Sequence, residues 1–296
     1  MFNSIEEIQS AMEEAQYITD RPTATVLYLS LKLGKPILVE GEAGVGKTEI
    51  AKVLAQILET KLIRLQCYEG LDVSTSLYEW NYPKQILWMK HAETCESPRE
   101  AVEKEIFSQE FLIRRPLLEA IQTDSPKPPV LLIDEIDRSD EEFEAFLLEV
   151  LSDFQITIPE IGTLSAKKRP FVIITSNRTR EIHDALKRRC LYHWIDYPSF
   201  EKEHRIVLKR VPVINEILAD QICTFMQAVR EKDFYKKPGI AETLDWAQAL
   251  IQLQKDHLDR SAVEETLGCI LKHFEDMKRM REVDLDTCLG ALRKFS

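Results

Sequence analysis

The chain lacks paired cysteines, long apolar runs and an excess of basic residues, and each absence excludes a class of protein. Its six cysteines are widely scattered and form no C-x-x-C pair, which argues against a structural zinc site and a disulfide framework and fits a reducing cytoplasm. The longest apolar runs, such as PILV and VLLI, are far shorter than the roughly 18 residues needed to span a bilayer. The formal net charge of −11 disfavours a general attraction to nucleic acid or to an anionic membrane.

The N-terminal stretch also lacks the features of a secretory signal. It is acidic and contains neither a basic segment nor a long apolar core. Ser4 and Glu7 have the spacing of a capping box, so this stretch predicts a helix. We therefore expect a cytoplasmic protein without a membrane span.

Short apolar segments alternate with helical patterns over the first two thirds of the chain. Such alternation, with strands that are apolar throughout, is typical of an α/β fold in which helices cover both faces of a parallel sheet. The predicted strands are PILVEG (36–41), KLIRLQC (61–67), VLLIDEID (130–137), FVIITSN (171–177) and LYHWIDY (191–197).

Two stretches depart from this alternation. The segment 153–170 alternates apolar and polar residues and then turns at Ile161-Gly162, which predicts a β-hairpin inserted before the fourth strand. After Pro198 the strand patterns stop, and the remaining sequence is helical. We therefore predict two domains, a core with N-terminal helices over 1–200 and a small all-α domain over 201–296.

The clearest motif is GEAGVGKT at residues 41–48, which matches G-x-x-x-x-G-K-[ST] between a predicted strand and a predicted helix. In this setting the backbone N–H groups of the turn and of the helix N-terminus point at phosphate oxygens. Lys47 is expected to reach the β- and γ-phosphates, and the Thr48 hydroxyl to coordinate Mg²⁺. The sequence therefore predicts a nucleotide-binding loop made of Gly41, Glu42, Ala43, Gly44, Val45, Gly46, Lys47 and Thr48.

Two carboxylates and one amide follow later predicted strands. Asp134 and Glu135 directly follow the four apolar residues of VLLIDEID. They therefore stand at the carboxyl end of the strand, where the ligands of open α/β sheets bind. Asp134 is expected to hold Mg²⁺ beside Thr48, and Glu135 to position and polarise the water that attacks the γ-phosphate of ATP. Asn177 ends the next strand and is expected to hydrogen-bond the γ-phosphate and the same water. A lone asparagine after a strand is more often a turn residue. The prediction for Asn177 therefore depends on the order of the strands.

These motifs, together with a helical C-terminal region, resemble the AAA+ ATPases. The hairpin narrows the resemblance to the clade that carries an insertion before the sensor strand. Within that clade the chain is similar to the MoxR family, nearest its CoxD-type branch from operons for aerobic carbon monoxide dehydrogenase. The strings that carry this likeness are GEAGVGKTEIAKVLA, LIRLQCYEGLD, YEWNYPKQ, LLIDEIDRSDEEFEAFLLEVLSDFQITIPE and TSNRTREIHDALKRRCLYHWIDYP.

The resemblance implies partners and cofactors that the site residues alone do not. It implies ATP and Mg²⁺ as cofactors, and a homo-oligomer in the form of a hexameric ring. It also implies a partner with a von Willebrand A domain and a metalloenzyme client whose active site the ATPase helps to mature. For the CoxD-type branch that client is a molybdenum- and copper-containing carbon monoxide dehydrogenase. Nucleic acid is not expected among the partners.

Three consecutive basic residues, Lys187, Arg188 and Arg189, have their nearest acids at Asp184 and Asp196, and neither obviously neutralises the two arginines. In the MoxR pattern, the arginine that reaches the neighbouring subunit's γ-phosphate lies eight residues before the Tyr-Pro that closes the last strand. Tyr197-Pro198 is that pair here, so the resemblance assigns the role to Arg189, with Arg188 as the second candidate. Such a guanidinium stabilises charge spread over phosphoryl oxygens. The alternative is that these residues complement the dipole of a helix C-terminus.

One position departs from the family pattern. Many relatives carry an arginine at the start of a lid helix, in a Gly-x-Ser-x-Arg setting that contacts the γ-phosphate within one subunit. The matching stretch here begins at Gly239, and Thr243 stands where the arginine is expected. Either Lys236 or Lys237 substitutes for it, or the helical domain senses nucleotide differently.

Two further features have two interpretations each. Arg138 follows the DEID motif and either makes a second contact between subunits or pairs with Asp140 or Glu141 at a helix start. The segment 77–84 places aromatic residues at alternating positions. That spacing fits either a grip on a protein partner or a strand or loop packed on the core.

Several functions compete with an ATP-driven remodeller. A nucleotide-dependent switch or scaffold with little hydrolysis stays open because the arginine of the lid helix is missing. A small-molecule P-loop kinase would rarely need the hairpin or an arginine that acts between subunits, and a GTPase would need an N-K-x-D motif that the chain lacks. A DNA-acting machine is disfavoured by the acidic composition.

Overall fold

The computed structural model describes residues 2–94, 98, 102 and 105–292 of the chain. The chain forms two compact units. The first unit comprises Met1–Ile8, Arg21–Glu40 and Thr48–Trp194, and the second comprises Gln9–Asp20, Gly41–Lys47 and Ile195–Ser296. The division at residue 200 into a core and an all-α domain stays a prediction.

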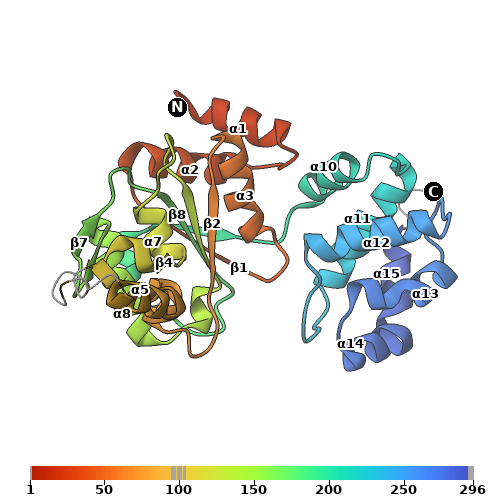
Figure 1. Ribbon diagram of the computed structural model, residues 1–296. Helices are drawn as coiled ribbons and strands as arrows, with labels where there is room; N and C mark the ends of the chain where they lie inside the picture. The colour runs from red at the N-terminus through yellow and green to blue at the C-terminus, as the bar shows by residue number, and fades with distance from the viewer. Residues whose placement is uncertain (1, 95–97, 99–101, 103–104, 293–296) are drawn as a thin grey trace. The chain divides into compact units, whose positions relative to one another are not determined.

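A five-stranded sheet forms the centre of the first unit, and its strands are the five that the sequence predicts (Figure 1). β5 pairs in parallel with β2 and with β8, and β8 pairs in parallel with β1. All residues of β1 and β5 are buried, which explains why these strands are apolar throughout. The predicted α/β fold with a parallel sheet is therefore confirmed. The strands are β1 (Ile37–Gly41), β2 (Leu62–Gln66), β5 (Val130–Asp134), β8 (Phe171–Ser176) and β9 (Leu191–Ile195), in the order β2-β5-β8-β1-β9.

The strand order decides which polar residues meet at the carboxyl edge of the sheet. β5 lies between β2 and β8, so the ends of these three strands are neighbours. The register places Gln66 beside Asp134 on β2 and β5, and Ile133 beside Ile174 on β5 and β8. Residues that follow β5 and β8 in the sequence therefore come together at one edge, where ligands of open α/β sheets bind.

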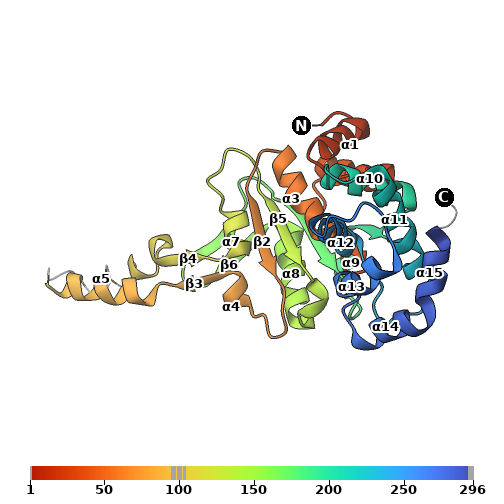
Figure 2. The ribbon, with the colours of Figure 1, turned by 90° about the vertical axis from the view of Figure 1, so that its right-hand side faces the viewer.

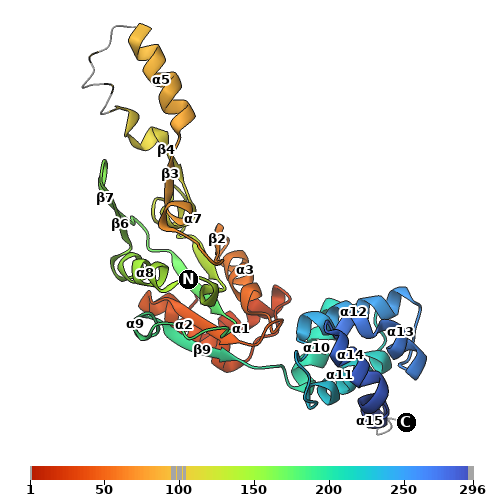
Figure 3. The ribbon, with the colours of Figure 1, turned by 90° about the horizontal axis from the view of Figure 1, so that it is seen from below.

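Two antiparallel ribbons are added to this sheet. β6 (Gln155–Ile158) pairs with β7 (Gly162–Ser165), which confirms the hairpin predicted over 153–170. β3 (Tyr78–Trp80) pairs with β4 (Leu112–Arg114), a ribbon that the sequence analysis did not predict. Figures 2 and 3 show that this second ribbon carries α5 (Tyr82–Thr94) away from the five-stranded sheet.

The aromatic residues of segment 77–84 divide between core and surface. Trp80 is buried in the core of the first unit, and Tyr78 packs against that core. Tyr82 begins α5 and is 59% exposed. The interpretation as a packed strand therefore holds for Tyr78 and Trp80, and only Tyr82 is open to a partner.

Helix α8 (Glu141–Asp153) shows how the sequence encodes the covering helices. The Asp140 side chain accepts a hydrogen bond from the Phe143 backbone N–H at 2.8 Å and caps the helix N-terminus. The buried residues Phe143, Leu147, Val150 and Leu151 recur at helical spacing and face the core. The other helices up to β9 are α1 (Ile5–Glu14), α2 (Arg21–Leu33), α3 (Lys47–Ile57), α4 (Val73–Ser76), α7 (Pro116–Ile121) and α9 (Asp184–Arg189), with 3-10 turns η1 (Gln109–Phe111) and η2 (Ile136–Arg138).

The C-terminal part of the second unit is helical, as predicted. Its core includes Trp246 and Phe225, whose ring centroids lie 5.3 Å apart. No helix in the described part of the chain is both long enough and apolar enough to cross a membrane. The helices are α10 (Phe200–Arg210), α11 (Glu216–Arg230), α12 (Ile240–Gln252), α13 (Arg260–Ile270), α14 (Phe274–Arg279) and α15 (Leu285–Leu292), with a π-helical turn η3 (Met280–Asp284).

Candidate active site

The predicted phosphate loop lies between β1 and α3. Gly44 and Gly46 have φ angles of 77° and 96°, in the left-handed region that glycine adopts without a steric cost. A Cβ atom on Gly41 would lie 2.2 Å from the carbonyl oxygen of Ile195. Lys47 is buried and donates hydrogen bonds from Nζ to the carbonyl oxygens of Gly41 at 2.7 Å and Glu42 at 2.6 Å. The sequence of this loop is therefore set by backbone geometry, and its lysine is directed back over the turn.

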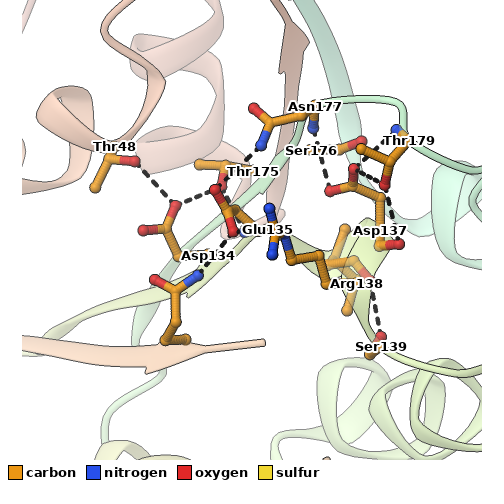
Figure 4. Close-up of polar contacts among 12 residues, drawn as sticks. Thr48, Asp134, Glu135, Asp137, Arg138, Ser139, Thr175, Ser176, Asn177 and Thr179 are labelled. Carbon is orange, nitrogen blue, oxygen red and sulfur yellow. Dashed lines mark hydrogen bonds and ion pairs between the residues drawn. The ribbon is translucent and has the colours of Figure 1, made fainter. Parts of the chain in front are cut away.

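Asp134 is a buried carboxylate at the carboxyl end of β5, with 2% of its surface exposed. Its Oδ1 accepts hydrogen bonds from the hydroxyls of Thr48 at 2.9 Å and Thr175 at 2.6 Å (Figure 4). Its Oδ2 accepts two hydrogen bonds from the Arg64 guanidinium, from Nε at 3.1 Å and Nη2 at 2.5 Å. The predicted pairing of Asp134 with Thr48 is thus present in the structure.

Glu135 adopts a left-handed backbone conformation, with φ 56° and ψ 53°, which is uncommon for a residue other than glycine. Its backbone N–H donates to Thr175 Oγ1 at 2.9 Å. Its Oε1 accepts from Asn177 Nδ2 at 3.1 Å, and its Oε2 accepts from Gln66 Nε2 at 3.2 Å and pairs with Arg138 Nε at 3.0 Å. The structure therefore brings the two predicted residues Glu135 and Asn177 into direct contact (Figure 4).

Asp137 is a further carboxylate of the site, and its hydrogen bonds fix the backbone at Asn177. The sequence did not predict this role. Asp137 Oδ1 accepts from the Asn177 backbone N–H at 3.1 Å, and its Oδ2 accepts from the backbone N–H and the hydroxyl of Thr179 at 2.9 Å and 2.6 Å. Burial acts to raise the pKa of Asp137, but the hydrogen bonds from Thr179 and Asn177 outweigh it, so the pKa lies below its ordinary value. A carboxylate fixed in this way holds the loop after β8 in place (Figure 4).

Sequence reasoning missed Arg64, Gln66, Thr175 and Asp137. Arg64 and Gln66 lie on β2, and only the pairing of β2 with β5 brings them to the carboxylates. Asp137 was part of the recognised DEID motif, and its spacing of two from Glu135 was the available signal. Nothing in the sequence ranked Thr175 above other hydroxyl residues.

Cys67 follows Gln66 and lies close to the same carboxylates. Its backbone N–H donates to the carbonyl oxygen of Asp134 at 2.9 Å. Burial first, and then the Asp134 carboxylate, raise the pKa of the Cys67 thiol to about 12. The thiol is therefore protonated at neutral pH and is not a nucleophile.

Arg138 pairs with a different acid from the two that the sequence suggested, and its contact with a second subunit stays a prediction. It pairs with Glu135 three residues before it, and the Nε to Oε2 distance is 3.0 Å. The interpretation that Arg138 pairs with Asp140 or Glu141 was wrong in its partner, since Asp140 caps α8. The reason is the tight turn η2, which folds Arg138 back over the glutamate.

Arg188 and Arg189 are exposed and form the C-terminus of α9. Arg189 donates from Nε to the Ser152 hydroxyl at 2.8 Å and from Nη1 to the Ala185 carbonyl oxygen at 3.3 Å. These contacts tie it to the end of α8 and to its own helix. A role toward a second subunit and a role at the helix dipole both stay open.

In the second unit, Thr243 is buried and does not point into solvent. Its hydroxyl lies 2.6 Å from Glu203 Oε1 and 3.1 Å from the Gly239 carbonyl oxygen, and Arg230 donates to it from Nη2 at 3.2 Å. The start of α12 nevertheless lies against the phosphate loop, because a Cβ atom on Gly239 would lie 2.7 Å from the carbonyl of Gly44. The position expected to carry an arginine is thus part of the helical core.

The residues at the edge of the sheet fit a hydrated Mg²⁺ ion. Mg²⁺ prefers hard oxygen ligands, and it is usually bound through one or two carboxylates together with substrate phosphates and water. The Thr48 hydroxyl and the Asp134 carboxylate lie side by side and supply such oxygens. Among the described residues, no group of three or more His, Cys, Asp or Glu side chains could hold a metal by itself.

The fold and the motifs together define an α/β protein with a P-loop nucleotide-binding site. Residues 37–195, more than half of the chain, match the family model described as "ATPase family associated with various cellular activities (AAA)". The chain therefore belongs to the AAA family of ATPases.

Similar sequences and structures extend over most of the chain. An uncharacterized protein of Staphylococcus haemolyticus (strain JCSC1435) is 25% identical over 259 residues, which are 85% of this chain and 89% of that protein. A variant of Thermotoga maritima RuvB has a TM-score of 0.51 at 18% identity, covering 92% of this chain and 82% of that one. A candidate ATPase from Cytophaga hutchinsonii has a TM-score of 0.50 at 16% identity, covering 99% and 94%. At these identities the likeness to the two structures shows the fold alone.

Proposed function

We propose that this chain hydrolyses ATP with Mg²⁺, as a subunit of a ring, and couples hydrolysis to the remodelling of a protein client. The observation that carries the hydrolysis is the contact between Glu135 and Asn177, whose Oε1 and Nδ2 atoms lie 3.1 Å apart. The Glu135–Asn177 contact lies at the same edge of the sheet as the Thr48–Asp134 pair. A general base and a metal-binding carboxylate on adjacent residues are what ATP hydrolysis needs and nucleotide binding alone does not.

Each residue has a defined task in this proposal. Thr48 and Asp134 would hold Mg²⁺, and the ion would supply positive charge to offset that of the phosphates. Glu135 accepts a proton from the attacking water and orients it. Asn177 fixes the Glu135 carboxylate through Oε1 and presents its amide toward the γ-phosphate. The phosphate loop supplies backbone N–H donors, and Lys47 supplies a positive charge.

Arg189 is proposed to complete the site of a neighbouring subunit, with Arg188 beside it. Both residues are exposed at the end of α9. A permanently charged, planar guanidinium on the surface of a homo-oligomer can reach the γ-phosphate held by the next copy. The interface would be heterologous, and repeating it can close a ring. The family resemblance favours a closed ring of six subunits.

The client and partner of the ring are proposed from the resemblance to the MoxR family. We propose a cytoplasmic protein that acts with a von Willebrand A-domain partner to mature a metalloenzyme, namely a molybdenum- and copper-containing carbon monoxide dehydrogenase. The chain would supply force or conformational change and would not carry the metal of the client.

One observation favours a second candidate, a switch or scaffold that binds nucleotide and hydrolyses little. Thr243 replaces the expected arginine, and its hydroxyl is committed to Glu203. Within one subunit, the start of α12 then provides no guanidinium to the γ-phosphate from that position. Turnover would depend on the residues around Glu135 and on Arg189 of a neighbour.

The experiment that tests this proposal measures ATP turnover against protein concentration. The samples are the wild type, Arg189→Ala, Glu135→Gln, and an equal mixture of the two variants. If Arg189 acts on a neighbour, wild-type activity rises more steeply than linearly with concentration, and each variant alone is nearly inactive. Random mixing gives an intact Glu135 and an intact Arg189 at about one quarter of the interfaces, so the mixture recovers about that share of activity.

Arg188→Ala is the matched control, because it removes the adjacent exposed guanidinium. Recovery in the mixture, together with a smaller effect of Arg188→Ala, supports a ring with Arg189 acting between subunits. A specific activity that does not depend on concentration or on Arg189 contradicts the ring. ATP binding with no measurable turnover at any concentration supports the switch or scaffold.

A further inference from the structure

Arg64 contacts Asp134, the carboxylate of the proposed Mg²⁺ site. The inference drawn below from this contact rests on the proposed function. The Arg64 guanidinium contacts Asp134 Oδ2 with two nitrogen atoms, Nε at 3.1 Å and Nη2 at 2.5 Å. Asp134 is 2% exposed, whereas the Arg64 side chain is 50% exposed. The buried carboxylate is therefore neutralised by a side chain that has room to move into solvent.

The other oxygen of Asp134 is also occupied. Oδ1 accepts hydrogen bonds from Thr48 at 2.9 Å and Thr175 at 2.6 Å. Both threonines are neutral, and a hydroxyl can turn its proton elsewhere at little cost. Arg64 is different, because its positive charge cannot be removed near neutral pH.

We propose that Arg64 competes with Mg²⁺ for Asp134 and so sets the concentration of the ion that the site requires. A guanidinium and a divalent cation on one carboxylate repel each other, so binding of one weakens binding of the other. Arg64 keeps the buried charge of Asp134 paired whenever the ion is not bound. The ion must offset the loss of that pair before it binds.

The position of Arg64 gives the competition a second consequence. Its Nη2 also donates to Gln66 Oε1 at 2.5 Å, and the Gln66 amide in turn donates from Nε2 to Glu135 Oε2 at 3.2 Å. Arg64 therefore fixes which end of the Gln66 amide faces Glu135. Displacement of Arg64 from Asp134 by the ion loosens this arrangement at the same time.

The test is a Mg²⁺ titration of nucleotide binding for the wild type and Arg64→Gln. The probe is a fluorescent ATP analogue that is not hydrolysed, so the readout does not depend on turnover. Arg138→Gln is the matched control, because Arg138 is also a half-exposed guanidinium, 57% exposed, and pairs with the adjacent Glu135. We expect Arg64→Gln to lower the Mg²⁺ midpoint by about two- to fivefold, the upper part of the range for a partly exposed ion pair. Arg138→Gln should shift it by less than about twofold, since it does not contact Asp134.

A second readout separates competition from support of the fold. Without Mg²⁺, Arg64→Gln lowers the unfolding temperature, because Asp134 loses its charged partner. At saturating Mg²⁺ with the analogue, the difference from the wild type becomes smaller. A merely structural role predicts the same difference at every Mg²⁺ concentration. Arg64→Lys, which keeps the charge but loses the planar fork, should give an intermediate midpoint, and it replaces Arg64→Gln if that variant does not fold.

An unchanged or raised Mg²⁺ midpoint in Arg64→Gln overturns the inference while leaving the proposed function intact. The same holds if the Arg138→Gln control shifts the midpoint equally, because a general loss of positive charge would then explain the effect. If the wild type binds the analogue without any dependence on Mg²⁺, this inference fails, while the turnover experiment still tests the proposed function. If the wild type shows no turnover with Mg²⁺ at any concentration, the hydrolysis in the proposed function fails.

Discussion

Each of the two units contains an arginine paired with a buried carboxylate, but the two arginines differ in how far they are exposed to solvent. In the second unit, Arg230 donates two hydrogen bonds to Glu203 at 2.6 Å and 2.7 Å, and both side chains are buried. In the first unit, Asp134 is buried but its partner Arg64 is half exposed. A pair that is buried on both sides is costly to open, whereas a pair with one exposed partner can exchange it. The burial of the first pair therefore suits the exchange of Arg64 for Mg²⁺ that we propose, whereas the second pair holds helices together.

The remaining hydrogen bonds around Glu203 and around Glu135 also differ in burial. Arg230 also donates to the carbonyl oxygen of Pro238 at 2.8 Å, and Gln227 donates to Glu203 at 2.7 Å. These bonds join α10, α11 and the start of α12. Around Glu135, by contrast, the two contacts to Oε2 come from residues on β2 and η2 that are not buried. The contacts around Glu135 are therefore closer to solvent than those around Glu203.

The largest expected effect concerns the exchangeable cluster. Glu135→Gln should lower ATP turnover by about 10²- to 10⁴-fold, the range for loss of a general base, while binding of the ATP analogue is retained. The reason is that Gln keeps the shape and the contact with Asn177 but cannot accept a proton. Turnover and binding are measured on the same sample. Glu141→Gln, an exposed acid at the start of α8, is the control and should change neither. Loss of binding along with turnover would show that Glu135 holds the site together and is not a base.

The next effect concerns the structural cluster. Arg230→Met should lower stability by about 3–5 kcal/mol, because it leaves the Glu203 carboxylate buried without its charged partner. The Arg205–Glu13 pair has a similar distance of 2.7 Å but is half exposed. Arg205→Met should therefore cost no more than about 1 kcal/mol. Hydrogen exchange of the α11 and α12 amides measures both variants, and equal effects would contradict the comparison.

The smallest effect concerns Asp137, whose pKa in the folded protein lies below its ordinary value. Its charge contributes stability that is complete above the unfolded pKa of about 3.9 and is lost as the pH falls through the lower folded pKa. Asp137→Asn should cost about 1–3 kcal/mol at neutral pH, the cost of leaving buried donors unsatisfied. The gap between variant and wild type should narrow as the pH falls below about 3.9.

Denaturant unfolding at several pH values measures the Asp137 effect. Asp124→Asn removes an exposed carboxylate of the same unit and should stay within about 0.5 kcal/mol of the wild type. A gap for Asp137→Asn that widens in acid would show that the hydrogen bonds from Thr179 do not favour its charged form.

The parts of the site that lie within one continuous motif could be predicted. GEAGVGKT contains its own turn geometry, since glycines supply the φ angles and Lys47 bonds the same loop. Glu135 and Asn177 were identified because each directly follows an apolar strand, and the parallel pairing of β5 with β8 brings them together. Such local signals need no knowledge of distant contacts.

The parts that depend on a third element could not be predicted. Arg64 and Gln66 stand on β2 among ordinary alternating residues, and no pattern indicates that β2 is the neighbour of β5. The β3–β4 ribbon was not predicted for a similar reason, because its two strands are short and lie far apart in the sequence. Thr243 was identified as a departure, but its partners Glu203 and Arg230 come from two other helices.

The sequence by itself determined the elements of the sheet, the hairpin, the phosphate loop and the two residues that follow β5 and β8. Backbone conformation and burial of a strand depend on neighbouring residues, so their pattern is written along the chain. The tertiary structure alone decided that Arg64 pairs with Asp134 and that the Thr243 hydroxyl hydrogen-bonds the Glu203 carboxylate. Charge pairing acts through space between side chains that distant elements bring within a few ångströms, and its strength depends on how much water remains around them.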